Sequence, residues 1–225
     1  MAGDIRIIET SDGSQSLFIK SLNETYHSTH GALNESQYVF LEKGLSFWVN
    51  QSNKRNIKIL EVGFGTGLNA LLTWAYAKKN PDVDINYITL EPFPLDDSIY
   101  SNLRYAELID GMDHNELIRL HGAPFDGVER MENFSFSKSK LGVRDYKDEA
   151  LDLIYFDAFA PSKQAEMWDI DIFKSLYHLL NTGGALVTYC AQGQFKRNIV
   201  EVGFHLETLQ GPPGKKEMVR AIKLE

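Results

Sequence analysis

Glycines at alternate positions, preceded by an acid, form the first stretch of this sequence that could do chemistry. The stretch EVGFGTGLNALLTW begins at Glu61, and its glycines are Gly63, Gly65 and Gly67. Glycine lets a turn adopt positive φ and lets backbone N–H groups approach a ligand closely, and the following helix adds the positive end of its dipole. The stretch therefore predicts a nucleotide-binding turn between a strand and a helix, although glycines that serve only packing would give the same pattern.

The spacing of these glycines distinguishes two classes of nucleotide site. Dinucleotide enzymes carry G-x-G-x-x-G, whereas acid-x-G-x-G-x-G resembles the first motif of S-adenosylmethionine-dependent methyltransferases. That cofactor has no phosphate, but its methionine ammonium suits an acid such as Glu61, directly or through water. We therefore expect S-adenosylmethionine as the cofactor. The expected loop contacts are Glu61, Gly63, Phe64, Gly65, Gly67 and Asn69.

Two further acids each end an apolar, strand-like run. Glu91 ends INYITLE, and its distance along the chain from Gly67 is close to the offset of about 20 residues expected for an acid that binds ribose hydroxyls. Asp157 ends LDLIYFD, and ligands of open α/β sheets bind beyond the carboxyl ends of the strands. A solvent-facing Glu91 and a helix-capping Asp157 are the alternatives, but the spacing and the buried strand favour a binding site.

The stretch LIRLHGAPFDGVE gives a weaker signal for the adenine end of the site. We predict a strand at 117–121, with His121 as an ordinary residue at its end. Methyltransferases often place an Asp directly after such a strand, but the first acid here is Asp126. Backbone groups around Ala123 or the ring of Phe125 are the candidates in place of that Asp, and the sequence leaves this contact open.

The composition fits one soluble domain. The 225 residues are 43% hydrophobic and 24% charged, and no apolar run approaches the roughly 20 residues of a membrane span. The N-terminus has no apolar signal core, so we expect a cytoplasmic protein, and we take it to be a monomer. The one cysteine, Cys190, excludes a disulfide framework and a Cys-rich zinc site, so no metal is expected.

Strand-like and helix-like patterns alternate along most of the chain, which predicts an α/β fold with a parallel sheet. The expected strands are 57–62, 84–91, 117–121, 152–157 and 184–190, and the expected helices are 67–79, 96–109, 166–180 and 193–201. FHLETLQ and EMVRAIKLE predict an antiparallel pair at one sheet edge. Residues 1–52 are predicted to add a hairpin around Asp12-Gly13 and a helix over 34–50, and 53–225 to form the core, with an exposed insertion near 133–149.

Several stretches resemble one family, the tRNA 5-aminomethyl-uridine methyltransferases, which form the methyltransferase half of a bifunctional tRNA 5-methylaminomethyl-2-thiouridine biosynthesis protein. They are HGALNESQYVFLEKG, EVGFGTGLNALLTW, LEPFPL, FDAFAPSKQAEMW, GGALVTYCAQGQFKRNIVEVGF and GPPGKKEMVRAI. The resemblance implies a Rossmann-like class I methyltransferase fold, with a mostly parallel seven-stranded sheet and an antiparallel C-terminal edge strand. It also implies methyl transfer to the aminomethyl nitrogen of the wobble uridine. Because this chain ends at Glu225, we expect it to lack the flavin-dependent oxidase step of the bifunctional protein.

The resemblance also assigns residues to the reacting groups. Asp157 corresponds to the acid beside the amine, and the loop DAFAP resembles the Asp/Asn-Pro-Pro-aromatic signature of amino-nitrogen methyltransferases. Glu35 and Ser36 are expected to lie over the methionine end of the cofactor. Phe159 and Trp168 are candidates for stacking on a looped-out base.

A tRNA partner needs cations, although the net charge is −8. Six Lys or Arg stand against three Glu between 192 and 224. We predict that anticodon-loop phosphates contact two pairs of cations, Lys196 with Arg197 and Lys215 with Lys216. Solvated lysines on a helix and a turn are nearly as good an explanation for each pair taken singly.

Three other functions fit parts of the pattern. A nucleotide-dependent oxidoreductase would use the same crevice, but the glycine spacing and DAFAP weigh against it. A binding module without turnover would have no need to keep Glu61, Glu91 and Asp157. A methyltransferase for a small-molecule amine differs only in the family-specific stretches and in the basic C-terminal segment.

Overall fold

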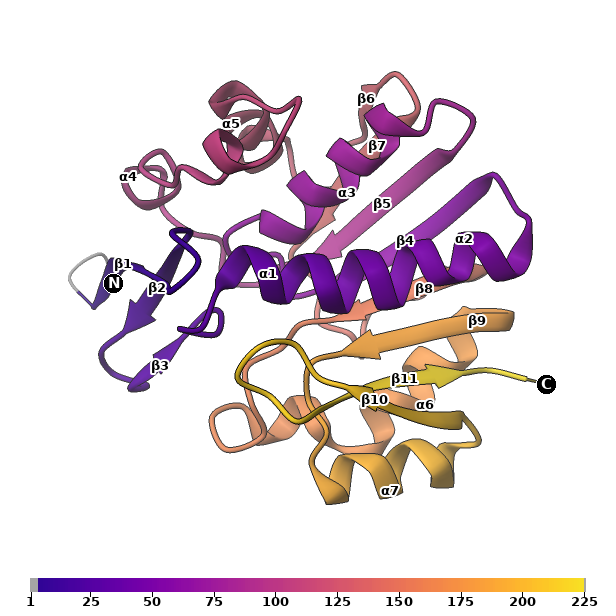
Figure 1. The fold of residues 1–225 in the computed structure, drawn as a ribbon. Helices are drawn as coiled ribbons and strands as arrows, with labels where there is room; N and C mark the ends of the chain where they lie inside the picture. Colours follow the sequence, from indigo (N-terminus) through magenta and orange to yellow (C-terminus); the bar gives the residue numbers. More distant parts are fainter. Residues whose placement is uncertain (1–3, 225) are drawn as a thin grey trace.

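The computed structural model describes residues 4–224, so the predicted domain limits at 1 and 225 lie outside the described residues. Figure 1 shows a central twisted sheet with helices on both faces and a small separate sheet near the N-terminus. The central sheet has eight strands in the order β10-β11-β9-β8-β4-β5-β7-β6. Within residues 4–224, no helix is both long enough and apolar enough to cross a membrane.

Five neighbouring strands form the parallel part of this sheet. They are β9 (Leu180–Thr188), β8 (Leu151–Phe156), β4 (Asn56–Val62), β5 (Asp84–Leu90) and β7 (Phe134–Ser139). Successive residues of β4 alternate between two apolar cores, since Ile59 belongs to the core on one face and Leu60 to the core on the other. This alternation is what a strand covered by helices on both faces requires.

Antiparallel strands complete both edges of the sheet. β11 (Glu217–Ile222) lies between β9 and β10 (His205–Gln210) and is antiparallel to both, which confirms the predicted C-terminal pair. β6 (Glu129–Met131) pairs with β7 at the other edge. The sheet therefore has eight strands instead of the expected seven, and β10, not the final strand, forms the C-terminal edge.

The helices pack in two layers. The first layer holds α3 (Leu68–Lys79), α5 (His114–Gly122) and a continuous N-terminal helix, and the second holds α6 (Ile170–Leu179) and α7 (Gly193–Val202). The N-terminal helix consists of α1 (Ala32–Ser36), the π-helical η1 (Gln37–Ser46) and α2 (Phe47–Ser52), which confirms the helix expected over 34–50. Short turns η2 (Tyr105–Leu108) and η3 (Ala165–Trp168) and the short α4 (Asp97–Tyr100) break the expected helices 96–109 and 166–180.

The small sheet contains the predicted hairpin. β1 (Ile5–Glu9) pairs antiparallel with β2 (Gln15–Ile19) around a turn in which Gly13 has φ +80°. β3 (Glu24–Thr25) adds a short third strand. The chain that leaves β3 passes over the carboxyl end of the central sheet before it enters α1.

The strand predicted at 117–121 is wrong, because these residues belong to helix α5. The Asp113 side chain caps the helix by accepting hydrogen bonds from the backbone amides of Asn115 and Glu116. The Glu116 carboxylate in turn accepts a hydrogen bond from the Asp113 amide. Leu117 and Leu120 are buried at helical spacing. The capping box and the three-residue apolar period together favour a helix over a strand.

The exposed insertion predicted near 133–149 is also wrong in its first half, which is strand β7. Phe134 and Phe136 are fully buried, and serines alternate with them in the pattern of a strand. Phe134 stacks on Trp74 of α3 with ring centroids 5.8 Å apart. Only the segment after Ser139 forms a loop.

We predict that Phe134→Ala destabilises the protein by about 3–5 kcal/mol, the range for removing a buried aromatic ring. The surface variant Lys147→Ala, from the loop of the same segment, should change the free energy of unfolding by less than about 0.5 kcal/mol. Urea unfolding monitored by circular dichroism measures both. A small loss for Phe134→Ala would contradict its place in the core.

Candidate cofactor and active site

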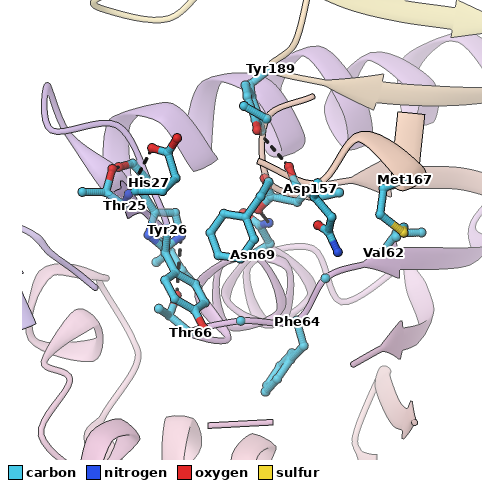
Figure 2. A pocket seen from close by; sticks show the side chains of 18 of the residues that line it. Thr25, Tyr26, His27, Val62, Phe64, Thr66, Asn69, Asp157, Met167 and Tyr189 are labelled. Carbon is cyan, nitrogen blue, oxygen red and sulfur yellow. Dashed lines mark hydrogen bonds between the residues drawn. The ribbon is translucent and has the colours of Figure 1, made fainter. Parts of the chain in front are cut away.

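A cavity with a volume of about 460 Å³ lies beyond the carboxyl ends of β4, β5 and β8. Its floor is the loop that joins β4 to α3, and the loops after β5, β7 and β8 form its sides. Residues 24–30 with Glu35, and the pair Gly214 and Lys215, close it from the two ends of the chain. Figure 2 shows Tyr26, Asn69 and Asp157 around this space. A cavity of this size and position suits a small organic ligand.

The three glycines of the first motif have different tasks. Gly63 has φ +92°, and a Cβ there would lie 2.7 Å from the backbone oxygen of Asp157. Gly65 has φ +50° and faces the cavity. Gly67 has φ +77°, caps the N-terminus of α3 and does not line the cavity, and a Cβ there would lie 3.0 Å from the Phe64 ring, so its role is structural. Gly63 and Gly65 therefore bring bare backbone to a ligand, and Gly67 shapes the turn.

Glu91 lies at the end of β5, where the sequence places a ribose-binding acid. It lines the cavity and is 9% exposed. Its carboxylate accepts hydrogen bonds from the amides of Gly65 (2.9 Å) and Phe93 (2.8 Å). Burial raises the pKa of Glu91, while these amides lower it. The two amides fix the carboxylate and leave lone pairs that can accept the two hydroxyls of a ribose.

Glu61 is fully buried behind the loop and does not line the cavity. Burial raises its pKa to about 8, and the Thr89 hydroxyl and the Asn69 side chain lie near enough to oppose this rise. Neither carboxylate oxygen has a hydrogen-bond partner at bonding geometry within residues 4–224. Because buried polar groups are satisfied in native proteins, an ordered water between Glu61 and the loop fits this site better than direct contact with a ligand.

Asp157 stands in the cavity wall directly after β8. Asn69 donates a hydrogen bond from its side-chain amide to the Asp157 carboxylate at 2.8 Å, so the first turn of α3 orients this acid. Burial raises the pKa of Asp157 to about 7, and the nearby Glu35 carboxylate raises it further, while Asn69 and Lys215 lower it. The acid is therefore poised between its two protonation states near neutral pH.

The N-terminal segment contributes two cavity residues that the sequence did not reveal. The ring of Tyr26 meets that of Phe159 edge to face, with centroids 5.1 Å apart. His27 is buried, and this burial lowers its pKa to about 4, so its ring is neutral at pH 7. The segment carries no motif, and its position depends on the small sheet that precedes it. Residues 24–30 of this segment line the cavity.

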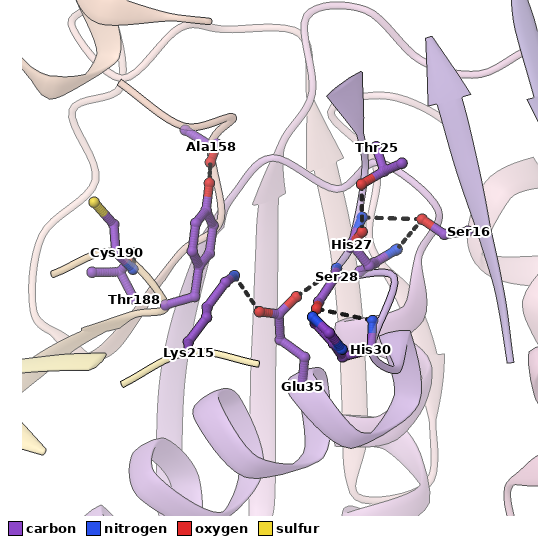
Figure 3. Close-up of polar contacts among 11 residues, drawn as sticks. Ser16, Thr25, His27, Ser28, His30, Glu35, Ala158, Thr188, Cys190 and Lys215 are labelled. Atoms are coloured by element: carbon purple, nitrogen blue, oxygen red, sulfur yellow. Dashed lines mark hydrogen bonds and ion pairs between the residues drawn. The ribbon is translucent and has the colours of Figure 1, made fainter. Parts of the chain in front are cut away.

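Glu35 and Lys215 meet at the same end of the cavity (Figure 3). Glu35 is 5% exposed, accepts a hydrogen bond from the Ser28 amide at 2.9 Å, and forms an ion pair with Lys215. The Lys215 ammonium also lies over the Tyr189 ring, 3.8 Å from its centroid. The sequence placed Glu35 at a cofactor site and Lys215 on a tRNA phosphate, whereas the structure brings both into one wall.

Ser36 and Trp168 lie away from the cavity, which corrects two sequence assignments. Ser36 is the last residue of α1, is buried, and is absent from the cavity wall. Trp168 is 5% exposed, packs edge to face against Phe156 and Phe195, and donates its indole N–H to the Phe159 carbonyl at 2.7 Å. Trp168 is therefore a core residue that supports the loop and cannot stack on a substrate base. Phe159 itself remains in the wall, half-buried.

The other predicted phosphate contacts are on the outer surface. Lys196 pairs with Glu217 at 2.5 Å, which places the start of α7 beside the start of β11. Arg197 is exposed and bonds to Gln194, and Lys216 is exposed next to the cavity residue Lys215. None of Lys196, Arg197 and Lys216 lines the cavity.

The predicted adenine contacts, Ala123 and Phe125, both lie outside the wall of the main cavity. Asp126 also lies outside it and accepts a hydrogen bond from the Ser139 hydroxyl at 2.6 Å. Beside Glu91, the wall is instead apolar and comes from two loops. Its side chains are those of Pro92, Phe93, Leu141 and Val143. These could sandwich a planar base.

We predict that Asp157→Asn changes stability in a pH-dependent way. Folding raises the pKa of Asp157 from 3.8 to about 7, so the folded state binds more protons than the unfolded state in this window and wild-type stability falls as pH rises through it. Asparagine does not bind this proton, so the variant lacks this pH dependence of stability. The melting temperature of Asp157→Asn, relative to wild type, should therefore be higher at pH 8 than at pH 5.

Differential scanning fluorimetry across this pH range measures the effect. The surface variant Asp171→Asn serves as a control for loss of one negative charge and should show no comparable trend. A difference between Asp157→Asn and wild type that stays constant from pH 5 to pH 8 would contradict the raised pKa.

Comparisons with known proteins agree with the geometry. Residues 136–224 match the family model of S-adenosyl-L-methionine-dependent methyltransferases. The chain is 32% identical over 216 residues to the tRNA 5-methylaminomethyl-2-thiouridine biosynthesis bifunctional protein MnmC of Burkholderia thailandensis, and the match covers 87% of this chain and 32% of that protein. It is 31% identical over 226 residues to the protein of the same name from Pseudoalteromonas atlantica, covering 90% and 31%. The chain thus spans about a third of the length of these relatives.

Solved structures support the fold. The crystal structure of MNMC2 from Aquifex aeolicus superposes with a TM-score of 0.82 at 24% identity, covering 98% of this chain and 70% of that one. A probable spermidine synthase from Corynebacterium glutamicum superposes with a TM-score of 0.56 at 15% identity, covering 97% and 76%. These matches confirm the predicted class I methyltransferase fold. Together, the sequence matches and the fold make this chain similar to S-adenosyl-L-methionine-dependent methyltransferases of the MnmC type.

Proposed function

We propose that this protein transfers a methyl group from S-adenosylmethionine to the aminomethyl nitrogen of 5-aminomethyl-uridine, with or without a 2-thio group, at the wobble position of tRNA. One observation carries the proposal. Asp157 follows β8 in the wall of the same cavity that contains Gly63 and Glu91, and Asn69 holds its carboxylate at 2.8 Å. An acid oriented beside a cofactor loop is what an enzyme needs to position an amine. The curated relatives are tRNA 5-methylaminomethyl-2-thiouridine biosynthesis proteins, and this supplies the class of substrate.

The residues present fit the cofactor. Glu91 offers a carboxylate fixed by two backbone amides for the ribose, and the apolar wall beside it suits adenine. A side chain at Gly63 would collide with Asp157, so the loop there leaves space only for backbone contact. The cofactor supplies an electrophilic methyl group on a sulfonium. Asp157 and Glu35 present negative charge at that end, which suits the positive charges of the sulfonium and the methionine ammonium.

The amine must lose a proton before its lone pair can react. An alkyl amine has a pKa near ~10, so about one molecule in 10³ is neutral at pH 7, a handicap of roughly 4 kcal/mol. Burial lowers the pKa of an amine, and a neighbouring sulfonium repels an ammonium. Burial also raises the pKa of Asp157 to about 7, which makes it a better proton acceptor than an ordinary Asp. We infer that Asp157 mainly aims the amine through one N–H bond, and that proton acceptance is secondary.

The surface around the cavity fits an extruded base with its backbone outside. Phe159 lines the wall and can stack on a uracil ring, supported from behind by Tyr26. The Lys196–Glu217 ion pair joins the two segments that carry Arg197 and Lys216. These two exposed cations would contact phosphates of the tRNA backbone. Anticodon-loop binding on this side is part of the proposal.

Nucleoside mass spectrometry tests the proposal directly. The purified protein is incubated with methyl-labelled S-adenosylmethionine and tRNA from cells that lack this methylation. We expect label in 5-methylaminomethyl-uridine or its 2-thio form. tRNA that carries 5-carboxymethylaminomethyl-uridine is the control and should stay unlabelled, because its nitrogen is already substituted. Label in another nucleoside, or only in a small-molecule amine, would refute the substrate and leave the fold and cofactor site standing.

Two variants of Asp157 test its role. Asp157→Asn keeps a group that can accept one N–H bond, so we expect it to retain part of the methylation rate. Asp157→Ala removes the acceptor, and its rate should fall much further. Single-turnover rates at saturating cofactor, with cofactor affinity measured in parallel, provide the comparison. Equal losses in the two variants at unchanged cofactor affinity would argue against orientation and for proton acceptance.

A further inference from the structure

Acidic side chains outnumber basic ones in the wall of the cavity. Four acids line it, namely Glu24, Glu35, Glu91 and Asp157, and of the described residues in its wall Lys215 alone is a Lys or Arg. His27 is neutral at pH 7, because burial lowers its pKa to about 4. S-adenosylmethionine carries two positive groups, the sulfonium and the ammonium, and one negative group, the methionine carboxylate. The acids suit the positive groups, which leaves Lys215 as the complement of the carboxylate.

Lys215 is held so that it points inward. It lies in the loop between β10 and β11, and its ammonium pairs with Glu35 of α1 and lies 3.8 Å from the centroid of the Tyr189 ring. The second oxygen of Glu35 accepts the Ser28 amide at 2.9 Å, so Glu35 itself is fixed. An ammonium has three N–H donors, and within residues 4–224 no second hydrogen-bond acceptor contacts that of Lys215. Donors therefore remain for a ligand.

A cofactor bound along this cavity would have its methionine carboxylate at the end where Lys215 lies. If its ribose lies on Glu91, the rest of the molecule extends across Gly63 and Gly65 toward Asp157. Tyr189, Glu35 and Lys215 line the same cavity and contact one another, since Lys215 pairs with Glu35 and lies over the Tyr189 ring. The positive charge of Lys215 is close enough to lower the pKa of Asp157, which agrees with this order along the cavity.

We propose that Lys215 binds the methionine carboxylate of S-adenosylmethionine, with Glu35 and Tyr189 as positioning residues that aim its ammonium into the cavity. This inference rests on the proposed function. It replaces the assignment of Lys215 to a tRNA phosphate, because the Lys215 side chain is 30% exposed and is paired with a carboxylate that is 7% exposed. A phosphate contact suits the outward-facing neighbour Lys216 instead.

The test compares S-adenosylmethionine with decarboxylated S-adenosylmethionine, which lacks only the carboxylate. Isothermal titration calorimetry should show that wild type binds the intact cofactor more tightly. In Lys215→Met, affinity for S-adenosylmethionine should fall about 10- to 100-fold, the range for a hydrogen bond to a charged group, while affinity for the decarboxylated ligand stays within about threefold. Lys216→Met is the matched control, and its selectivity between the two ligands should equal that of wild type.

Two further variants guard against a purely structural effect, since Lys215→Met leaves Glu35 without its partner. The double variant Lys215→Met/Glu35→Gln removes both charges and should also lose selectivity. Lys215→Arg keeps the positive charge and should retain most of the selectivity for the intact cofactor. Thermal unfolding confirms that each variant is folded.

Different outcomes overturn different claims. Equal loss of affinity for both ligands in Lys215→Met and in the double variant would show that Lys215 acts on the pocket as a whole and would refute the carboxylate contact. Unchanged selectivity in Lys215→Met would also refute it, and weaker tRNA binding in that case would restore the phosphate assignment. Failure of wild type to bind either ligand would refute the proposed function together with this inference.

Discussion

The contact between the backbone at Gly63 and the backbone at Asp157 is the constraint on which the site depends. A side chain at Gly63 would place its Cβ 2.7 Å from the Asp157 carbonyl oxygen, so the two strand ends can meet only if this residue is glycine. β4 and β8 are parallel neighbours, with Val62 paired to Phe156, and both loops therefore leave the sheet at the same edge. Asn69 then ties the Asp157 side chain to the first turn of α3. The loop after β4 and the side chain of Asp157 are consequently held together by a backbone contact and a hydrogen bond.

The electrostatics of this unit explain why it suits a cation. Burial raises the pKa values of Asp157 to about 7 and of Glu61 to about 8, which means that their ionised forms are destabilised in the protein without a ligand. A bound sulfonium and an ammonium would stabilise the ionised forms again. Binding a positively charged cofactor next to Asp157 would therefore relieve a cost that folding imposes, and stability and ligand affinity would be coupled through this acid.

The sequence predicted the features that depend on local pattern. The glycine loop after β4, Glu91 after β5 and Asp157 after β8 follow buried strands whose ends the topology brings to one edge. The helix α5 differs from the strand predicted at 117–121, because a short apolar run such as this one fits either element and the Asp113–Glu116 capping box decides for the helix. Strand β7 was missed because Phe134 and Phe136 alternate with serines over only six residues, which gives the segment a polar composition.

Features that depend on contacts between distant segments were not predictable. Lys215 enters the cavity only because the loop between β10 and β11 lies against α1, and no local pattern reports that contact. Tyr26 and His27 reach the cavity through the small N-terminal sheet. Trp168 has the composition of a stacking residue, but its burial against Phe156 and Phe195 follows from the packing of α6 and α7 on the sheet.

Titration of the purified protein with S-adenosylhomocysteine and with NAD tests the central claim most directly. Both ligands carry an adenosine, and a site that recognises only adenine and ribose would not distinguish them. With acids at its far end and no described motif for a pyrophosphate, the cavity should bind S-adenosylhomocysteine in the micromolar range or tighter and give no measurable heat with NAD. Tight binding of NAD without a response to S-adenosylhomocysteine would contradict this account and favour an oxidoreductase.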